Sequence, residues 1–364
     1  MKTAMRPFLR NIVALIVIGM LLGCARSQDP EAMYRDYVDR LVNVTGFEPR
    51  SVTEMEPIPP YPRPRDSVLP EEEVRVGFLT LLSLGECQLL QAVSERNSSL
   101  GRVQAASGRL LYEANFLARI RACESQLLAS QDQDREFIDQ VVTIRQIKEA
   151  NLPRTFWNAT FGGPEFRTLL STGTPPLQRS ESLALAETEL ALDQLTLLGK
   201  ELMDHPERVA DAPLEQQLYA LQAQKSVGKL LHGLQLSRHY LSQADDVLRQ
   251  TADANRLCPM GKKSQRGEYL FNVFVKFYAG GIQPYLSVLH RQSGPLLEQL
   301  HALRRIETAA APGTYGTFYD RWLNPETRDG LWRSFDAALK DHTRSWQTVL
   351  THCGLMPQGP DDLR

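Results

Sequence analysis

The chain has 364 residues, of which 42% are hydrophobic and 23% are charged, and its 41 basic and 43 acidic residues give a formal net charge of −2. These values are ordinary for a folded globular protein and exclude a chain that is disordered throughout. The balanced charge also excludes the strongly basic composition that is typical of nucleic-acid-binding proteins.

The N-terminus has the pattern of an exported protein. Lys2, Arg6 and Arg10 precede an uncharged, mostly apolar run over residues 12–23. Twelve helical residues span about 18 Å, which is too short for a hydrocarbon core of ~30 Å but suits a secretory signal peptide. The run ends at Cys24 in the sequence Leu-Leu-Gly-Cys, which resembles the lipobox of bacterial lipoproteins. A plain signal peptide with an incidental cysteine and a short buried helix are the alternatives.

We therefore predict that Cys24 is lipidated and that this lipid attaches the protein to a membrane. Two or three acyl chains hold a protein firmly, whereas one chain binds only marginally. Ala25 follows the cysteine. By resemblance to the sorting rule of enteric-type lipoproteins, this residue implies the outer membrane, with the protein facing the periplasm. No later segment approaches 18 consecutive apolar residues, so we expect no membrane span.

Four further cysteines follow the lipobox: Cys87, Cys123, Cys258 and Cys353. An even number in an oxidising compartment favours two disulfides, for which three connectivities are possible. We favour Cys87–Cys123 and Cys258–Cys353. Four buried free thiols are the alternative, and a zinc site is disfavoured because the cysteines lack the close spacing of metal ligands.

The sequence that follows Cys24 predicts a short tether, a helix and a proline-rich strap. Residues 25–30 are polar, and apolar residues then recur every three or four positions, which predicts a helix over 31–44. Five prolines follow within residues 57–64. They forbid a helix and favour polyproline II, so we interpret this segment as a stiff spacer or as a strap lying on the body. A ligand for a proline-binding groove is the alternative.

Amphipathic periodicity predicts helices through most of the remaining chain. Pro70 and the glutamates Glu71, Glu72 and Glu73 are typical of a helix N-terminus. Ser107 is expected to cap the next helix, and a further helix over 133–150 is expected to stop ahead of Pro153. An irregular connection over 151–179 follows, with a short helix at 165–170. The remaining predicted helices cover 180–204 (capped by Ser180), 213–256, 268–290 (interrupted near Gly280-Gly281), 296–303 and 332–353.

The predicted fold class is therefore all-α, an extended bundle of long antiparallel helices. Its predicted organisation is a lipoprotein signal peptide over 1–23, a lipidated tether with a short helix and a Pro-rich strap over 24–66, a helical domain over 67–355 and a flexible tail over 356–364.

Familiar catalytic motifs are absent from the sequence. It contains no GxSxG elbow, HExxH pair, Walker A loop or GxGxxG turn. His232 and His239 lie seven residues apart on one predicted helix, too far apart to share a metal without other donors, and His342 falls on a core stripe. We predict no enzyme activity, no metal and no cofactor.

Two polar segments are the candidate binding sites. The first includes Glu95, Arg96, Asn97 and Ser98, and the second begins with Trp157 and Asn158. The plain interpretations are a helix-hairpin turn with an Asn or Ser cap and an irregular connection around a buried Trp. Contact with a ligand or partner is the functional alternative. A nucleophilic serine at Ser98 would need a base within ~3 Å, which the local sequence does not supply.

Three strings carry a resemblance to a known family: residues 60–66 (PYPRPRD), 95–101 (ERNSSLG) and 157–161 (WNATF). They resemble a family of proteobacterial lipoproteins of unknown function, known as domain of unknown function 3080. The resemblance covers roughly residues 30–353, including the four cysteines in the same order. It supports a lipoprotein and implies no particular activity.

These patterns favour a non-enzymatic adaptor or scaffold that binds an envelope protein partner through the two polar segments. The first alternative is a carrier of an apolar ligand such as a lipid, with the aromatic residues between Phe271 and Tyr285 lining a cavity between helices. The second is a hydrolase or glycan-modifying enzyme that uses Glu95. No nucleic-acid partner is expected.

Overall fold

The computed structural model describes residues 28–50, 54–75, 77, 84–85, 87–130, 134–209, 212–222, 225–307 and 311–356. Within these ranges all regular structure is helical, which confirms the all-α prediction. None of the helices in these ranges is long and apolar enough to cross a membrane. The predicted signal peptide, Cys24 and residues 357–364 of the predicted tail lie outside the described residues.

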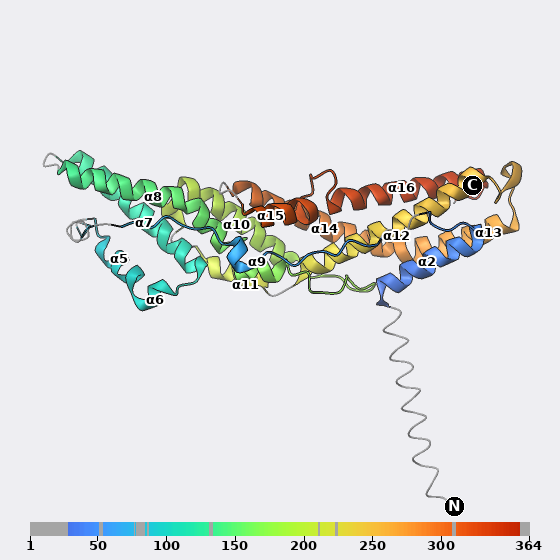
Figure 1. Ribbon diagram of the computed structural model, residues 1–364, viewed down its shortest axis with the longest axis horizontal. Helices are drawn as coiled ribbons and strands as arrows, with labels where there is room; N and C mark the ends of the chain where they lie inside the picture. Colours follow the sequence, from blue (N-terminus) through green and yellow to red (C-terminus); the bar gives the residue numbers. More distant parts are fainter. Residues whose placement is uncertain are drawn as a thin grey trace, which may run out of the picture.

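The helices form an elongated body with long helices running along its length (Figure 1). In chain order they are α2 (Pro30–Thr45), α3 (Pro64–Ser67), α5 (Leu90–Asn97), α6 (Ser99–Arg102), α7 (Ala106–Ala129), α8 (Arg135–Ala159), α9 (Pro164–Leu169), α10 (Ala186–Asp204), η1 (Pro206–Arg208), α11 (Leu214–Gln222), α12 (Ser226–Ala254), η2 (Pro259–Gly261), α13 (Gln265–Val273), η3 (Phe274–Ile282), α14 (Gln283–Ile306), α15 (Gly313–Phe318), η4 (Tyr319–Leu323) and α16 (Leu331–His352).

Different helices build the two ends of the body. The hairpin of α7 and α8 forms one end, and α2, α12, α13 and α16 lie together at the other (Figure 1). Between them, α10 packs against α14 and α11. The body therefore has no single central helix, and its core runs along its length.

The final helix, α16, follows its sequence pattern closely. The periodicity predicted a helix over 332–353 with one apolar face, and Phe335, His342 and Trp346 on that face are buried. This face packs mainly on α12. The helix predicted over 31–44 is likewise confirmed as α2, whose Tyr34 and Tyr37 have no exposed surface.

Residues 54–75, which we call the strap, run along the body without a long helix (Figure 1). Tyr61 is buried, and its hydroxyl donates to the carbonyl oxygen of Phe161 at 2.8 Å. The prediction of a helix N-terminus at Glu71 to Glu73 is wrong, since these residues are extended. The backbone N–H and carbonyl oxygen of Glu72 are bonded to the side chain of Asn151 in α8 and not to a helical turn of their own.

The predicted end of the helix ahead of Pro153 is wrong. The helix does not stop there, because α8 runs through Pro153 to Ala159. A proline inside a helix loses one backbone hydrogen bond and costs about 3 kcal/mol. Burial of the large side chains of Phe156 and Trp157, beyond the proline, compensates for this cost. The predicted irregular connection is therefore shorter, although its short helix is confirmed as α9.

Other boundaries also differ from the sequence patterns. Ser107 is not an N-cap but lies within α7, where its hydroxyl donates to Glu215. The helix that ends at Asp204 begins at Ala186 and not at Ser180. The predicted 213–256 helix consists of two helices, α11 and α12.

The aromatic segment forms a continuous helical rod instead of an interrupted helix. The rod runs from α13 through the π-helix η3 into α14, and η3 contains the two adjacent glycines Gly280 and Gly281. A π-helix accommodates a local irregularity without breaking the helix. The separate helix predicted over 296–303 is the later part of α14.

Both favoured disulfides are present. Cys87–Cys123 joins the residues before α5 to α7, and Cys258–Cys353 joins the end of α12 to the end of α16. The second bond closes a loop with a sequence separation of 95, which contributes about 4–5 kcal/mol in the chain-entropy model. It links the two helices that make the largest packing contact in the fold.

Candidate functional site

The first predicted segment belongs to a small flap, residues 90–105, that contains α5 and α6. None of the residues in this flap is buried. Its two ends attach to the same helix, through Cys87–Cys123 before the flap and through the chain itself at the start of α7. The flap therefore spans the side of α7, and its partly buried Val93 packs against the core.

Local hydrogen bonds shape the tip of the flap. Ser98 is the N-cap of α6, because its Oγ accepts from the backbone N–H of Gly101 at 3.0 Å and donates to the carbonyl oxygen of Glu95 at 2.7 Å. Arg96 Nη1 donates to the carbonyl oxygen of Gly101 at 2.6 Å. A Cβ at Gly101 would collide with the carbonyl oxygen of Glu95, so this turn requires glycine. Ser98 therefore caps a helix, as the plain interpretation anticipated.

The second predicted segment holds the strap to the body. Trp157 has no exposed surface, and its Nε1 donates to the carbonyl oxygen of Ser67 at 2.7 Å. Its ring makes an edge contact with Tyr315, with 4.7 Å between the centroids. Because Trp157 is fully buried, it contributes no surface for a partner.

Asn158 and Asn151 each bind the strap backbone with both atoms of the side-chain amide. Asn158 accepts from Leu69 N at 2.8 Å and donates to Leu69 O at 2.9 Å. Asn151 accepts from Glu72 N at 2.9 Å and donates to Glu72 O at 2.7 Å. Seven residues of helix rise about 10.5 Å and three extended residues span about 10 Å, so the two spacings match.

Sequence reasoning singled out Asn158 but missed Asn151. The available signal was the spacing of seven residues, which places both amides on one face of a helix. Pro153 lies between the two asparagines, and a proline normally ends a helix, so the sequence pattern does not place both amides on one helix.

A cleft lies between the flap, the strap and the helices α7 and α8. It consists of two adjoining pockets of about 650 and 570 Å³, which share Glu71, Glu73, Arg96 and Arg109 in their walls. Arg96 and Asn97 line the first pocket, and Arg96 and Asn158 line the second. The structure thus brings the two predicted segments to one cleft, although they lie about sixty residues apart in sequence.

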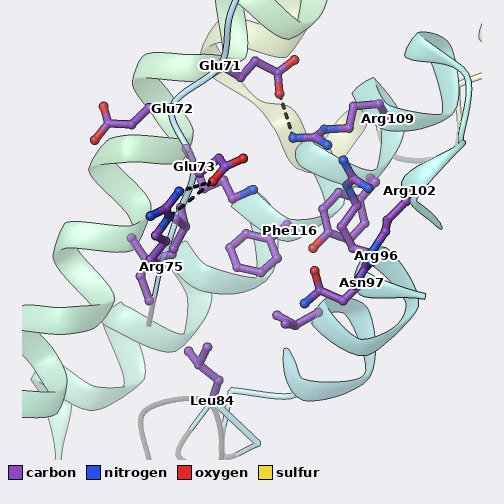
Figure 2. A pocket seen from close by; sticks show the side chains of 15 residues that line it. Glu71, Glu72, Glu73, Arg75, Leu84, Arg96, Asn97, Arg102, Arg109 and Phe116 are labelled. Carbon is purple, nitrogen blue, oxygen red and sulfur yellow. Dashed lines mark hydrogen bonds and ion pairs between the residues drawn. The ribbon is translucent and has the colours of Figure 1, made fainter. Parts of the chain in front are cut away.

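The opposite walls of the first pocket carry different charges. Arg96, Asn97 and Arg102 extend from the flap side, while Glu72, Glu73 and Arg75 belong to the strap side (Figure 2). Phe116 lies between the two walls (Figure 2). Polar and aromatic groups in such an arrangement are suited to binding a polar chain and not a purely apolar molecule.

An ion-pair network forms the floor of the cleft. Glu113 is 2% exposed and pairs with Arg109 at 3.3 Å and with Lys148 at 2.7 Å. Arg109 also pairs with Glu71 of the strap at 2.8 Å. Because the buried carboxylate has two cationic partners, its charge is compensated, and the network fixes the strap against α7.

Tyr112 also lines the first pocket, next to this network. Burial raises the pKa of its hydroxyl above the usual value, and the charge of Glu113 raises it further. Lys148 lies over the rings of Tyr112 and Phe116, at 5.8 and 5.1 Å from their centroids. Tyr112 is therefore a neutral hydroxyl at physiological pH and offers a hydrogen bond to a bound chain.

A family model for proteins of unknown function, DUF3080, matches residues 34–357. The chain belongs to this family. The match includes the strap, the flap and both asparagines that bind the strap, so the cleft lies entirely within the family region. No curated protein and no solved structure matches the chain.

The described part of the chain contains no group of three or more His, Cys, Asp or Glu side chains that could hold a metal ion. His232 instead bonds the carbonyl oxygen of Thr172 at 2.7 Å, and His239 bonds Gln243 at 2.7 Å. His342 is buried in the core, as its place on the apolar stripe predicted.

The aromatic residues between Phe271 and Tyr285 pack against other side chains. Tyr278 is buried against Tyr37 and Trp346, and the hydroxyl of Tyr285 donates to the carbonyl oxygen of Leu177 at 2.9 Å. Arg40 covers the ring of Phe277 at 3.9 Å. None of these aromatic residues lines either pocket of the cleft.

Proposed function

We propose that the protein is a lipoprotein, anchored in the outer membrane through Cys24 and facing the periplasm, and that it acts as an adaptor that binds an envelope protein in the cleft. The N-terminal sequence supports the anchor, because a basic segment and a short apolar run end at the lipobox cysteine. Ala25 supports the outer membrane by resemblance to the sorting rule of enteric-type lipoproteins.

The observation that carries the adaptor proposal is the meeting of the flap and the strap around one cleft. The flap fully buries none of its residues, so its position is set mainly by its two attachments to α7, with the partly buried Val93 as an apolar contact to the core. A segment of this kind can adjust to a partner at low cost, because little buried apolar contact is lost when it moves.

The packing of the aromatic segment favours a protein partner over a lipid ligand. A lipid carrier needs an apolar cavity. Tyr278, Phe277 and Tyr285 have protein partners instead, and the two pockets of the cleft carry charged side chains on both walls. Arginine and aromatic side chains are enriched in surfaces that bind proteins.

A photo-crosslinking residue at position 97 tests the adaptor proposal in cells. Asn97 is exposed and lines the cleft, so a bound partner would lie within reach of the probe. The matched control is a probe at Tyr269, which is 52% exposed on α13 at the other end of the body (Figure 1). We expect a discrete protein adduct from position 97 and not from position 269. Lipid adducts only, or no adduct, would contradict the proposal.

The anchor is tested separately with a Cys24→Ser variant. We expect the parent protein to incorporate a labelled fatty acid and to separate with the outer membrane on a density gradient. The variant should incorporate no label and leave the membrane fraction. Equal labelling of both proteins would show that Cys24 is not the lipidation site, without bearing on the cleft.

A further inference from the structure

The charge of the cleft is opposite to that of the whole chain. The two pockets are lined by six basic side chains and three acidic ones, whereas the complete sequence has a formal charge of −2. The acidic residues are Glu71, Glu72 and Glu73, and the basic residues are Arg75, Arg96, Arg102, Arg109, Lys148 and Arg167. Even when the buried Glu113 beneath them is included, the cleft keeps an excess of positive charge.

This excess charge is concentrated on the flap. Arg109 and Lys148 are occupied by Glu71 and Glu113. Arg96 is bonded only to a backbone carbonyl oxygen, and Arg102 is exposed, with no hydrogen-bond or ion-pair partner in the described part of the chain. Both guanidinium groups of the flap therefore face the cleft without a carboxylate. Arg167 of α9 also lacks a carboxylate, but it donates to the carbonyl oxygens of Pro62 and Gly162. Guanidinium groups bind carboxylates with two parallel hydrogen bonds, which makes them suitable for acidic side chains.

The strap already shows how the neighbouring wall binds an acidic chain. Glu71 pairs with Arg109, while the asparagine amides hold the backbone on either side of it at Leu69 and Glu72. The segment bound in this way is extended, and it carries three successive glutamates. The body of the protein therefore contains one docked acidic segment, and the basic flap lies across the cleft from it (Figure 2).

The size of the cleft favours an extended chain. One turn of α-helix with its side chains is 10–12 Å wide and 5.4 Å long, a volume of roughly 400–600 Å³. The larger pocket, of about 650 Å³, would hold little more than a single turn. An extended chain can instead pass through both adjoining pockets beside the strap.

We propose that the cleft binds an extended acidic segment of the protein partner, and that the carboxylates of this segment pair with Arg96 and Arg102 on the flap. This inference rests on the proposed adaptor function and specifies the chemistry of the partner. The exposed Glu72 of the strap lines the same pocket without an ion-pair partner in the described part of the chain, whereas Glu73 is paired with Arg75, so Glu72 competes with the partner at low ionic strength.

Fluorescence anisotropy with defined peptides tests this inference on the full-length protein purified in detergent. The probes are a labelled decapeptide of alternating glutamate and alanine and its counterpart with lysine in place of glutamate. We expect the glutamate peptide to bind and the lysine peptide not to bind. Raising the salt concentration should weaken binding, because exposed ion pairs are screened.

Variants locate the binding to the flap. Arg96→Glu/Arg102→Glu should weaken binding of the glutamate peptide at least tenfold. Lys262→Glu/Arg266→Glu is the matched control, since it makes the same change of charge at two exposed residues at the far end of the body. Arg102→Glu alone is included because Arg102 has no partner in the described structure, so its replacement leaves the flap turn intact.

Each outcome bears on a different proposal. Equal binding of the two peptides, or unchanged binding by the flap variants, would overturn the acidic-segment inference. A protein adduct at position 97 together with no preference for the glutamate peptide would keep the adaptor function and reject only the chemistry proposed for its partner. Loss of binding in the control variant as well would show a non-specific charge effect and would also overturn the inference.

Discussion

The hydroxyl of Tyr37 and the Nε2 atom of His342 lie 2.9 Å apart in the core between α2 and α16. Trp346 Nε1 donates to the same hydroxyl at 2.8 Å. Since the indole nitrogen can only donate, the Tyr37 oxygen accepts this bond. Burial lowers the pKa of His342 to about 3, so its ring is neutral in the folded protein near neutral pH.

This arrangement predicts a loss of stability in acid. In the unfolded chain His342 titrates near 6.5, so the unfolded state binds the extra proton between pH 6.5 and about 3. The contribution of His342 is fully present above pH 6.5 and is lost as the pH falls through this window. The titratable groups that face its ring are the hydroxyls of Tyr37 and Tyr278, which stay neutral there.

The His342→Gln variant isolates this effect, because glutamine retains polar atoms but does not titrate. We expect the free energy of unfolding, measured with urea from pH 4 to 7, to rise less steeply with pH in the variant. The slopes of the two curves should differ most below pH 6 and converge above pH 6.5. Parallel curves over this range would show that the titration of His342 does not contribute.

Glu307 predicts the opposite dependence. It is 5% exposed, and burial raises its pKa to about 8. Thr160 has one hydroxyl hydrogen, and its Oγ1 lies 2.8 Å from the carbonyl oxygen of Phe156 and 2.7 Å from Glu307 Oε1. A protonated Glu307 supplies the second hydrogen that these two contacts need. The titratable groups around it are Arg304, Tyr61 and Tyr315.

The folded state therefore retains a proton on Glu307 between pH 4.5 and about 8, whereas the unfolded state releases it. The contribution of this group is fully present below pH 4.5 and is lost as the pH rises through 8. Glu307→Gln should flatten the decline in the free energy of unfolding between pH 5 and 8. Glu187→Gln, an exposed change on α10, should leave the decline as it is. A similar response of both variants would contradict the assignment.

The paired asparagines predict local protection of the strap. Asn151→Ala and Asn158→Ala each leave a backbone N–H and a carbonyl of the strap unpaired, at a cost of about 1–3 kcal/mol. We expect faster hydrogen exchange at the amide of Glu72 in the first variant and at Leu69 in the second. Each variant serves as the control for the other. Exchange that is unchanged at both amides would show that these bonds do not hold the strap.

The two disulfides predict different consequences of their removal. In Cys87→Ser/Cys123→Ser the flap loses one of its attachments, so trypsin should cleave faster after Arg96 and Arg102. In Cys258→Ser/Cys353→Ser the free energy of unfolding should fall by about 4–5 kcal/mol, because that bond closes a long loop between core helices. Equal cleavage of the flap in the first variant and the parent protein would contradict the role given to Cys87–Cys123.

Two glycines make a further matched pair. A Cβ at Gly228 in α12 would collide with the backbone carbonyl of Ser171, whereas nothing lies within 4 Å of a Cβ at Gly316 in α15. Gly228→Ala should destabilise the protein by about 1–3 kcal/mol, measured by urea unfolding. Gly316→Ala should be neutral or stabilising, because alanine favours the helix. Equal changes in the free energy of unfolding would show that the loop at Ser171 moves aside without cost when alanine replaces Gly228.

Gly228 and Gly233 lie on the same helix, α12, but they meet different neighbours. The neighbour of Gly228 is the loop containing Ser171, and only Gly233 meets a helix, at Tyr285 and Leu289 of α14. Periodicity shows that a helix has an apolar face, but it does not show which element packs there.

The sequence by itself favoured the disulfide pairs that the structure contains. It also determined the helical class and the helices whose apolar residues follow one stripe, such as α2 and α16. Their pattern is local, because burial of one face is encoded in residues three and four apart. The resemblance of three short sequence motifs to the family was also visible in the sequence alone. The same reasoning placed Trp157 in the interior and Ser98 at a helix cap.

Only the tertiary structure decided the course of α8 through Pro153, the extended form of Glu71 to Glu73 and the meeting of the flap and Asn158 at one cleft. In each case a contact with a distant segment outweighed the local preference. Buried aromatic side chains compensated for the proline, and the amides of Asn151 and Asn158 took the backbone bonds that a helix would have used. Interactions between segments about eighty residues apart leave no periodic signal in the chain, so no local pattern could have predicted them.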